Sequence, residues 1–373
     1  MKIGFDLAQT SLPLAGCGWY AHTLLDAMAN AAPQVAFLGY RHFAYWLNDP
    51  ANQAPMPVRP NVVDYFAWRP REDVIAAWQE SRVTGIAPGA PQLVHSTSFQ
   101  APRFTQAKLV VTVFDLSFWA VSEYTTDRIR LDCQAGVLAA LEHAHGLIFI
   151  SEHARREFER FLPNYRRQGE LASIVTPLAA RWPSPGMAAA PTGDYWLVVG
   201  SLEPRKNLEN LLAAYEDYAR DHVAPKPLWL VGSGGWKNER ILARLRPLEE
   251  RGLARRLGFV PDEQMVGLYQ KAHALIFPSW YEGFGLPVLE AMTLGCPVIC
   301  SDHTSLPEIG DDAVHYIDPA SPATIAEAMR KLEWDLVQRD RLRHRAVVQA
   351  AKFSWQQTAK LTLAFYDRIL SAG

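Results

Sequence analysis

The chain has 373 residues, of which 49% are hydrophobic and 20% are charged, and this is the composition of an ordinary globular protein. A single hydrophobic core rarely serves so long a chain, so we expect two domains. The net charge of −2 provides no basic field for nucleic acid, which excludes that class of partner.

The first half of the chain alternates apolar runs with helical segments. Strands are predicted at residues 2–7, 34–40, 91–98, 108–118 and 144–152. Their apolar runs are continuous, which is typical of parallel strands covered on both faces. Gly16 and Gly18 lie where the first strand turns into the first helix. This alternation predicts a doubly wound, Rossmann-like α/β domain over residues 1–185.

A stretch rich in Pro, Ala and Gly, RWPSPGMAAAPTG at residues 181–193, interrupts this pattern and predicts an interdomain linker. The alternation of strands and helices then restarts, which predicts a second doubly wound domain over residues 194–354. In open α/β sheets, ligands bind beyond the carboxyl ends of the strands. The two domains are therefore expected to face each other across a central cleft.

No segment reads as a membrane anchor or a secretion signal. The N-terminal MKIGFDLAQT has no long apolar run, and no stretch reaches the ~18 apolar residues of a membrane-spanning helix. Cysteines stand at four positions without metal-like spacing, so free thiols in a reducing cytosol are favoured over disulfides. A cytoplasmic protein, either soluble or peripheral on the plasma membrane, is expected.

The stretch PSWYEGFGLPVLEAMTLGCPVICS, residues 278–301, predicts an anion site. Pro287 suits the first turn of a helix, because its missing N–H would have no helical partner there. The N–H groups from Phe284 to Val288 would then be left free at the positive end of this helix. Gly283 and Gly285 let the backbone approach a ligand without a Cβ atom in the way.

Two glutamates of the same stretch, Glu282 and Glu290, suggest what else the ligand carries. Carboxylates beside a phosphate site suit hydroxyl groups, from which they accept charge-assisted hydrogen bonds. We expect both carboxylates to face the ligand, and a nucleotide-sugar has a diphosphate flanked by hydroxyl-bearing rings. The alternative is a strand–turn–helix in which Glu290 merely interacts favourably with the helix dipole.

A second motif, VVGSLEPRKNLENLL, follows another predicted strand. Arg205 and Lys206 come at the end of this strand, just before a helix that Asn207 is expected to cap. Two fixed cations there can neutralise a diphosphate in place of a metal ion. The alternative is an exposed basic turn.

These motifs, together with LVGSGGW and LGFVPDEQMVGLYQKAHALIFPSWYEGFG, resemble the C-terminal half of the retaining glycosyltransferases of family four. The resemblance runs from Tyr195 to about Pro319, and AGCGWYAHTLL and ISEHARREF extend it loosely into the first half. It implies a GT-B fold, a nucleotide-sugar donor, retention of configuration, and no metal ion or other cofactor. It also implies that the last helix, residues 355–373, crosses back to the first domain.

The resemblance assigns roles to individual residues. Glu282 would contact the donor sugar and Glu290 the ribose, while Arg205 and Lys206 hold the diphosphate with the N–H groups of residues 284–286. Catalytic roles are implied for Glu282, Arg205, Lys206 and Asp115. The predicted donor-binding residues are Gly16, Gly18, Ser201, Arg205, Lys206, Phe259, Val260, Glu282, Gly283, Phe284, Gly285, Leu286 and Glu290.

One position departs from the family pattern. The family often has a His-Asp pair after a strand of the first domain, and here Phe114 replaces the histidine while Asp115 is kept. Since that histidine is implicated in contacts to the donor sugar, a catalytically silent nucleotide-sugar-binding protein is one alternative function. His95 could lie at the rim of the cleft in its place, or be an ordinary buried histidine.

The resemblance favours mannosyltransferase-like members, hence GDP-mannose as donor. Alternatives are a rhamnosyl- or glucosyltransferase using a dTDP- or UDP-sugar, and a GT-B epimerase or phosphorylase. A front-face reaction, in which the leaving phosphate oxygen takes the acceptor's proton, needs no protein nucleophile.

The acceptor is expected to bind the first domain. A glycan or lipid-linked glycan of bacterial surface polysaccharide is favoured. Aromatic residues at 40–80 suit sugar stacking or a lipid interface, or alternatively core packing. Arginines could touch anionic lipid head groups or form a solvated face with nearby glutamates. These arginines are Arg155, Arg156, Arg160, Arg166 and Arg167.

Overall fold

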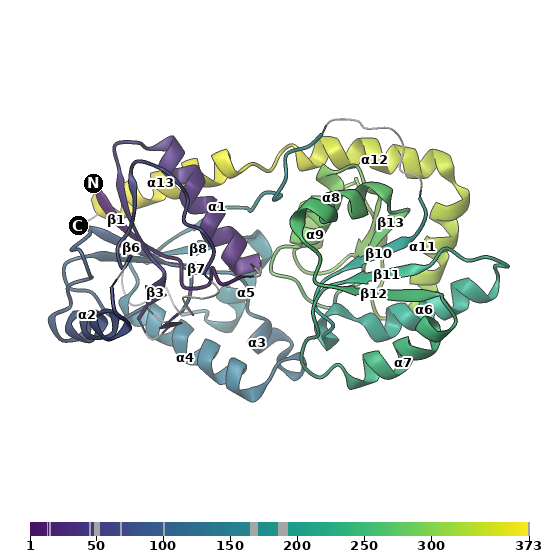
Figure 1. The fold of residues 1–373 in the computed structure, drawn as a ribbon, viewed down its shortest axis with the longest axis horizontal. Coiled ribbons are helices and arrows are strands. Elements are labelled where there is room, and N and C mark those ends of the chain that lie inside the picture. The colour runs from purple at the N-terminus through teal and green to yellow at the C-terminus, as the bar shows by residue number, and fades with distance from the viewer. Residues whose placement is uncertain are drawn as a thin grey trace. The chain divides into compact units, whose positions relative to one another are not determined.

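The computed structural model of the chain contains two compact units, each built on a parallel sheet (Figure 1). Unit 1 consists of Met1–Trp119, Asp127–Ala179 and Ser354–Gly373, and unit 2 consists of Ala120–Thr126 and Ala180–Phe353. The structure describes residues 1–12, 14, 16–44, 46–47, 53–67, 69–99, 101–164, 171–185 and 193–371. Residues 186–192 of the predicted linker, Tyr45, residues 48–52 and Trp68 of the aromatic-rich region at 40–80, and Arg166 and Arg167 lie outside this part.

Unit 1 has a seven-stranded sheet in the order β5-β2-β1-β6-β7-β8-β9, with all its strands parallel. The strands are β1 (Lys2–Asp6), β2 (Ala36–Tyr40), β5 (Val62–Asp64), β6 (Leu93–Ser96), β7 (Lys108–Val113), β8 (Gly146–Phe149) and β9 (Ala172–Val175). A short hairpin pairs β3 (His42–Phe43) with β4 (Trp46–Leu47). Sequence patterns missed β5, β9 and this hairpin, because two to four residues carry too little apolar periodicity.

The helices of unit 1 lie between its strands along the chain and at its C-terminal end. They are α1 (Gly16–Ala31), α2 (Arg71–Thr84), α3 (Ser117–Ala120), α4 (Asp127–His143), α5 (Glu152–Phe161) and α13 (Trp355–Ser371). Ser151 caps α5, since its side chain accepts a hydrogen bond from Ala154 N. The first and last helices, α1 and α13, pack against each other (purple and yellow in Figure 1). The last helix therefore belongs to the same unit as the N-terminus.

Unit 2 has a six-stranded parallel sheet in the order β12-β11-β10-β13-β14-β15. Its strands are β10 (Trp196–Val199), β11 (Leu228–Val231), β12 (Ala254–Gly258), β13 (Ala274–Phe277), β14 (Val298–Ser301) and β15 (His315–Ile317). Numbered within the unit, the order is 3-2-1-4-5-6, which is that of a dinucleotide-binding Rossmann sheet.

Helices cover both faces of this second sheet (Figure 1). They are α6 (Leu208–Arg220), α7 (Glu239–Glu250), α8 (Asp262–Lys271), α9 (Leu286–Thr293), α10 (Leu306–Gly310), α11 (Pro322–Trp334) and α12 (Leu336–Ala350). The α6 helix contacts α7 and α11, whereas α9 contacts α10 and α12. A core of apolar side chains around the fully buried Trp196 fills the space between the sheet and the first group.

Candidate functional site

The strand order of unit 2 determines where its site lies. Strands β10, β11 and β12 are added on one side of the sheet, and β13, β14 and β15 are added on the other side of β10, so the strand order reverses between the neighbours β10 and β13. Ligands bind at such a switch point. The chain segment Gly200–Lys206 follows β10, and Pro278–Glu282 follows β13. Trp280 N donates to Arg205 O at 2.9 Å, so the two loops are joined directly. Residues about 75 positions apart in the chain thus meet at one edge of the sheet.

Glycines allow the loops after β10 and β11 to touch. A Cβ atom on Gly232 would lie 2.0 Å from the carbonyl oxygen of Gly200, and one on Gly235 would lie 2.8 Å from that of Leu202. Leu202 N donates to Ser233 O at 3.0 Å across this contact. The close approach supports the short 3-10 helix η4 (Pro204–Lys206), which carries both predicted cations.

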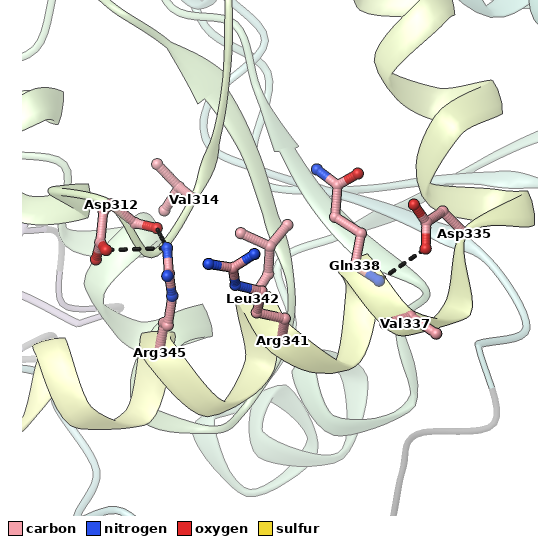
Figure 2. A pocket seen from close by; sticks show the side chains of 8 residues that line it. All are labelled: Asp312, Val314, Asp335, Val337, Gln338, Arg341, Leu342 and Arg345. Atoms are coloured by element: carbon pink, nitrogen blue, oxygen red, sulfur yellow. Dashed lines mark hydrogen bonds and ion pairs between the residues drawn. The ribbon is translucent and has the colours of Figure 1, made fainter.

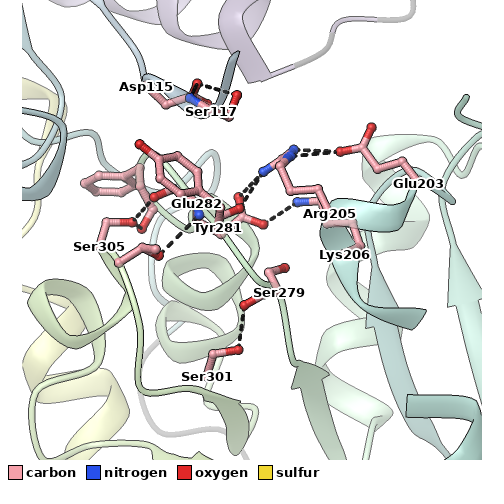
Figure 3. Close-up of polar contacts among 12 residues, drawn as sticks. Asp115, Ser117, Glu203, Arg205, Lys206, Ser279, Tyr281, Glu282, Ser301 and Ser305 are labelled. Atoms are coloured by element: carbon pink, nitrogen blue, oxygen red, sulfur yellow. Dashed lines mark hydrogen bonds and ion pairs between the residues drawn. The ribbon is translucent and has the colours of Figure 1, made fainter. Parts of the chain in front are cut away.

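The cations and acids of the two loops form one ion cluster (Figure 3). Lys206 Nζ lies 2.7 Å from Glu282 Oε1. Arg205 Nη1 lies 3.2 Å from Glu282 Oε2, and its Nη2 lies 2.7 Å from Glu203 Oε1. Arg205 also donates to the carbonyl oxygen of Tyr281 at 2.8 Å. The cluster therefore contains two positive and two negative side chains.

The sequence analysis predicted Arg205, Lys206 and Glu282 as members of one site, but it did not identify Glu203. This side chain is 1% exposed and holds the Arg205 guanidinium through Nε and Nη2. A single glutamate in a loop carries no signal of its own, so only the folded loop reveals it. In the structure Arg205 and Lys206 are paired with acidic side chains. The sequence of this basic turn does not reveal these pairs.

Burial and charge act against each other in the cluster. Burial favours the neutral form of Glu282, but the charges of Lys206 and Arg205 outweigh it and lower the pKa of this carboxyl. Burial also lowers the pKa of Lys206, against the opposing attraction of Glu282. We conclude that the pair is ionised at neutral pH, held in a largely dry environment where its field is weakly screened.

The start of α9 presents backbone donors. Gly285 adopts a φ of 106°, in the left-handed region that favours glycine, and Pro287 stands in the first turn. Within the described part of the chain, the N–H groups of Phe284, Gly285 and Leu286 have no hydrogen-bond partner. The expectation that Val288 N–H is also free is wrong, because it donates to Gly285 O at 2.9 Å.

Serine hydroxyls hold the loop before α9 in place. Ser305 Oγ donates to Glu282 O at 2.9 Å and to Phe284 O at 2.8 Å. At the end of β14, Ser301 Oγ donates to Ser279 O at 2.7 Å (Figure 3). Because these carbonyls are occupied, the loop is fixed with its backbone N–H groups available as donors.

Glu290 is held by an arginine inside unit 2. Its side chain is 1% exposed and is paired with Arg181, a partner that the sequence patterns did not predict, and its expected contact with a ligand stays a prediction. Arg181 Nε and Nη2 donate to its two oxygens at 2.5 and 2.9 Å, and Tyr269 Oη donates to Oε2 at 3.0 Å. Arg181 also contacts Asp262 at 2.9 Å, so this arginine and both of its acidic partners belong to unit 2.

Other predicted donor residues of unit 2 lie at strand ends. Ser201 is half-buried directly after β10, next to Gly200. Phe259 follows the edge strand β12 with 60% of its surface exposed, and Val260 is half-buried beside it. Gly283 lies between Glu282 and the start of α9. Their roles toward a ligand stay predictions.

The expectation that Asn207 caps α6 through its side chain is wrong. Its backbone is left-handed, with a φ of 57°, and its side chain makes no capping bond. Instead, Asn207 Nδ2 donates to the carbonyl oxygens of Pro278 and Pro319, at 3.0 and 2.7 Å. The residue thus ties the loop after β13 to the cation-bearing turn.

In unit 1, the glycines at the start of α1 differ. Gly18 is buried, and a Cβ atom there would lie 2.5 Å from Gln9 O, so the helix start packs directly on the loop after β1. Gly16 is exposed and has open space around its Cβ position. Of these two glycines, Gly18 is required by the packing of the helix start, whereas the predicted role of Gly16 toward a donor stays a prediction.

The residues around the missing histidine are packed into unit 1. Asp115 Oδ1 accepts hydrogen bonds from Ser117 N and Oγ at 2.9 and 2.8 Å, which caps α3 (Figure 3). Phe114 packs edge-on against Tyr20, with ring centroids 5.1 Å apart. His95 is fully buried between Tyr366 and Thr112, so it is the ordinary buried histidine of the two readings.

A separate pocket of about 420 Å³ lies beside α12 (Figure 2). Its walls include Arg341 and the Asp312–Arg345 ion pair, whose closest atoms are 2.9 Å apart. None of the predicted site residues lines it. Among the residues that the structure describes, no cluster of His, Cys, Asp or Glu suits a metal ion, and no helix is long and apolar enough to cross a membrane.

Comparison with known proteins shows that this chain is similar to enzymes that transfer sugars. The family model of glycosyl transferases group 1 matches residues 188–351. O-antigen chain mannosyltransferase B of Escherichia coli is 32% identical over 98% of this chain and 99% of its own length. The serotype-specific mannosyltransferase WbdA of the same species is 32% identical over 79% of this chain, which spans 39% of WbdA.

Solved structures agree on the fold. Sucrose-phosphate synthase from Thermosynechococcus elongatus superposes with a TM-score of 0.74 at 20% identity, covering 100% of both chains. Anabaena HepE in complex with UDP and glucose gives a TM-score of 0.70 at 15% identity, covering 98% of this chain and 99% of its own. The predicted GT-B fold is therefore confirmed.

Proposed function

Because this chain belongs to the glycosyl transferases of group 1 and is a glycosyltransferase, we propose that it transfers mannose from GDP-mannose with retention of configuration. The acceptor in this proposal is a glycan or lipid-linked oligosaccharide of bacterial surface polysaccharide. Support comes from the near full-length likeness to an O-antigen chain mannosyltransferase. The site in unit 2 supplies the chemistry that such a donor needs.

The observation that carries the proposal is the pairing of an ion cluster with free amides at the switch point of unit 2. Breaking the bond between C1 of the sugar and the phosphate oxygen leaves an oxocarbenium-like sugar and adds negative charge to the diphosphate. Arg205, Lys206 and the N–H groups at the start of α9 can stabilise that charge. We propose that these groups do so without a metal ion.

Glu282 has the second role in this proposal. Its oxygens lie next to both cations, and in the complex they would accept hydrogen bonds from hydroxyls of the donor sugar. As the acceptor oxygen bonds to C1 on the face that the diphosphate leaves, its proton passes to the leaving phosphate oxygen. This reaction accounts for the bonds and the proton without a nucleophilic side chain of the protein.

A donor survey tests the proposal. Binding of GDP-mannose, UDP-glucose and dTDP-rhamnose is measured by calorimetry in the presence of EDTA, and transfer to a lipid-linked oligosaccharide is followed by NMR of the anomeric proton. We expect binding and turnover with GDP-mannose, an α-linked product, and loss of turnover in Glu282→Gln. Preference for another nucleotide-sugar would overturn the choice of mannose, and a requirement for metal would overturn the proposed leaving-group stabilisation. Binding without any turnover would favour a silent binding protein.

A further inference from the structure

Arg181 belongs to unit 2 and is the first residue of the stretch predicted to be an interdomain linker, and the sequence analysis gave it no role at the site. The Arg181 side chain is 16% exposed, and it is paired with Glu290 of α9, which lies 109 positions later in the chain. We propose that Arg181 is a positioning residue of the donor site, which holds Glu290 as an oriented carboxylate that accepts a ribose hydroxyl. This inference rests on the proposed function, because it needs a nucleotide at that site.

The contact is a two-point one. Arg181 Nε donates to Glu290 Oε1 at 2.5 Å and Nη2 donates to Oε2 at 2.9 Å, which is the parallel arrangement that fixes a carboxylate in direction as well as position. Trp182 supports the arginine, since the guanidinium carbon lies 4.3 Å from the centre of its ring. A lysine could not reproduce both hydrogen bonds.

The surroundings of Glu290 explain why it needs this partner. The charged and titratable groups that face it are Arg181, Tyr269 and Asp262, of which Tyr269 Oη donates to Oε2 at 3.0 Å and Asp262 binds the other side of the guanidinium. Burial raises the pKa of Glu290 even with Arg181 in place. Without the arginine, the pKa of this carboxyl would rise further, and its protonated form is a weaker acceptor for a hydroxyl than the carboxylate.

The number of acceptor positions on the carboxylate is also informative. A carboxylate offers roughly four acceptor positions. Arg181 and Tyr269 use three of them, two on Oε2 and one on Oε1. The remaining position on Oε1 suits one hydroxyl. We therefore infer that Oε1 of Glu290 accepts one charge-assisted hydrogen bond from a ribose hydroxyl. It is not expected to bind a cation or a phosphate.

Binding of GDP to Arg181→Gln, compared with the wild type by calorimetry, tests the proposal. We expect affinity to fall by about tenfold or more, the equivalent of one hydrogen bond to a charged group. The affinity of the variant should rise with pH as Glu290 loses its proton, and this rise should come at a higher pH than any rise in the wild type, because Arg181 lowers the pKa of Glu290. A GDP analogue that lacks both ribose hydroxyls should bind the variant and the wild type equally.

Three further variants make the result decisive. Arg244→Gln removes an exposed ion pair with Glu216 and should leave affinity unchanged. Arg181→Lys keeps the charge and should restore part of the affinity that Arg181→Gln loses. If Arg181→Gln fails to fold, Arg181→Lys is used for the test in its place. Glu290→Gln should bind weakly at every pH.

The outcomes separate this inference from the proposed function. If the wild-type protein binds no nucleoside diphosphate in calorimetry, the proposed function is wrong. A wild type that binds GDP while Arg181→Gln and Arg181→Lys bind equally well would overturn the role of Arg181 alone. Tighter binding by either variant would also overturn it, because Arg181 would then be blocking Glu290.

Discussion

At the scale of single residues, the ion cluster of unit 2 balances burial against pairing. Lys206 and Glu282 retain 12% and 9% of their side-chain surface, so each charge depends on the other for stabilisation. Breaking a buried pair by removing one partner costs more than replacing both, because the remaining charge is left without compensation. Arg205, at 3.2 Å from Glu282, lessens that cost without abolishing it.

This asymmetry gives a stability prediction. Lys206→Met should lower the free energy of unfolding by about 3 kcal/mol, since Glu282 is then buried beside a single, longer contact. The double variant Lys206→Met/Glu282→Gln should be more stable than Lys206→Met alone, although it binds the donor no better. Urea unfolding of the wild type, both single variants and the double variant measures the coupling. Strictly additive losses would contradict the expected coupling.

At the scale of elements, the start of α9 depends on one backbone conformation. Gly285 has a φ of 106°, and a Cβ atom there would lie 2.5 Å from Leu306 Cδ2. The turn leaves the N–H groups of residues 284–286 as donors and is held by Ser305. Backbone geometry and side-chain packing thus require glycine independently of any ligand.

A pair of glycine substitutions tests this requirement. Gly285→Ala should destabilise the protein by about 1–3 kcal/mol through backbone strain and weaken nucleotide binding. Gly267→Ala is the matched control, because Gly267 lies inside α8 with open space at its Cβ position. That change should stabilise by about 0.5–1 kcal/mol, as alanine favours helix. Unfolding in urea and calorimetry with GDP would report both effects, and equal outcomes for the two variants would refute the argument.

At the scale of the whole molecule, buried polar groups bind the end of the chain to the first sheet. His95 in β6 lies 2.5 Å from Tyr366 Oη of α13 and 2.7 Å from Thr112 Oγ1 of β7. Tyr20 of α1 shares the same threonine at 2.9 Å. The last helix is thus specified as part of unit 1 by hydrogen bonds across 271 positions, in addition to apolar packing.

His95 also links stability to pH. Burial lowers its pKa from 6.5 to about 3 in the folded protein, so the unfolded chain binds the proton more tightly. Its contribution is present above about pH 6.5 and is lost as the pH falls toward about 3, at about 1.4 kcal/mol per pH unit.

We therefore expect His95→Gln to be less stable than the wild type at neutral pH, with a gap that narrows by about 2 kcal/mol at about pH 5. Urea unfolding at both pH values measures this gap. Other histidines with a lowered pKa, such as His273, are present in both proteins and cancel in the difference. A gap that does not change with pH would show that His95 binds a proton as readily in the folded state as in the unfolded chain, which contradicts the argument.

Local sequence patterns predicted much of the fold and part of the site. Continuous apolar runs such as those of β10 and β14 predict buried parallel strands, because each strand face is covered. The Pro287 helix start and the basic turn at Arg205 and Lys206 are also local features. Short edge strands escaped prediction because they contain too few residues to show a period.

The sequence by itself determined the parallel α/β architecture, the glycine-dependent turn before α9 and the family of the chain, because these depend on residues that are close together along it. Only the tertiary structure decided which charges pair. Glu282 meets Lys206 across 76 positions and Glu290 meets Arg181 across 109, through loops that the strand order brings together. Pairing energies depend on distance in space and on burial, and a linear pattern contains neither.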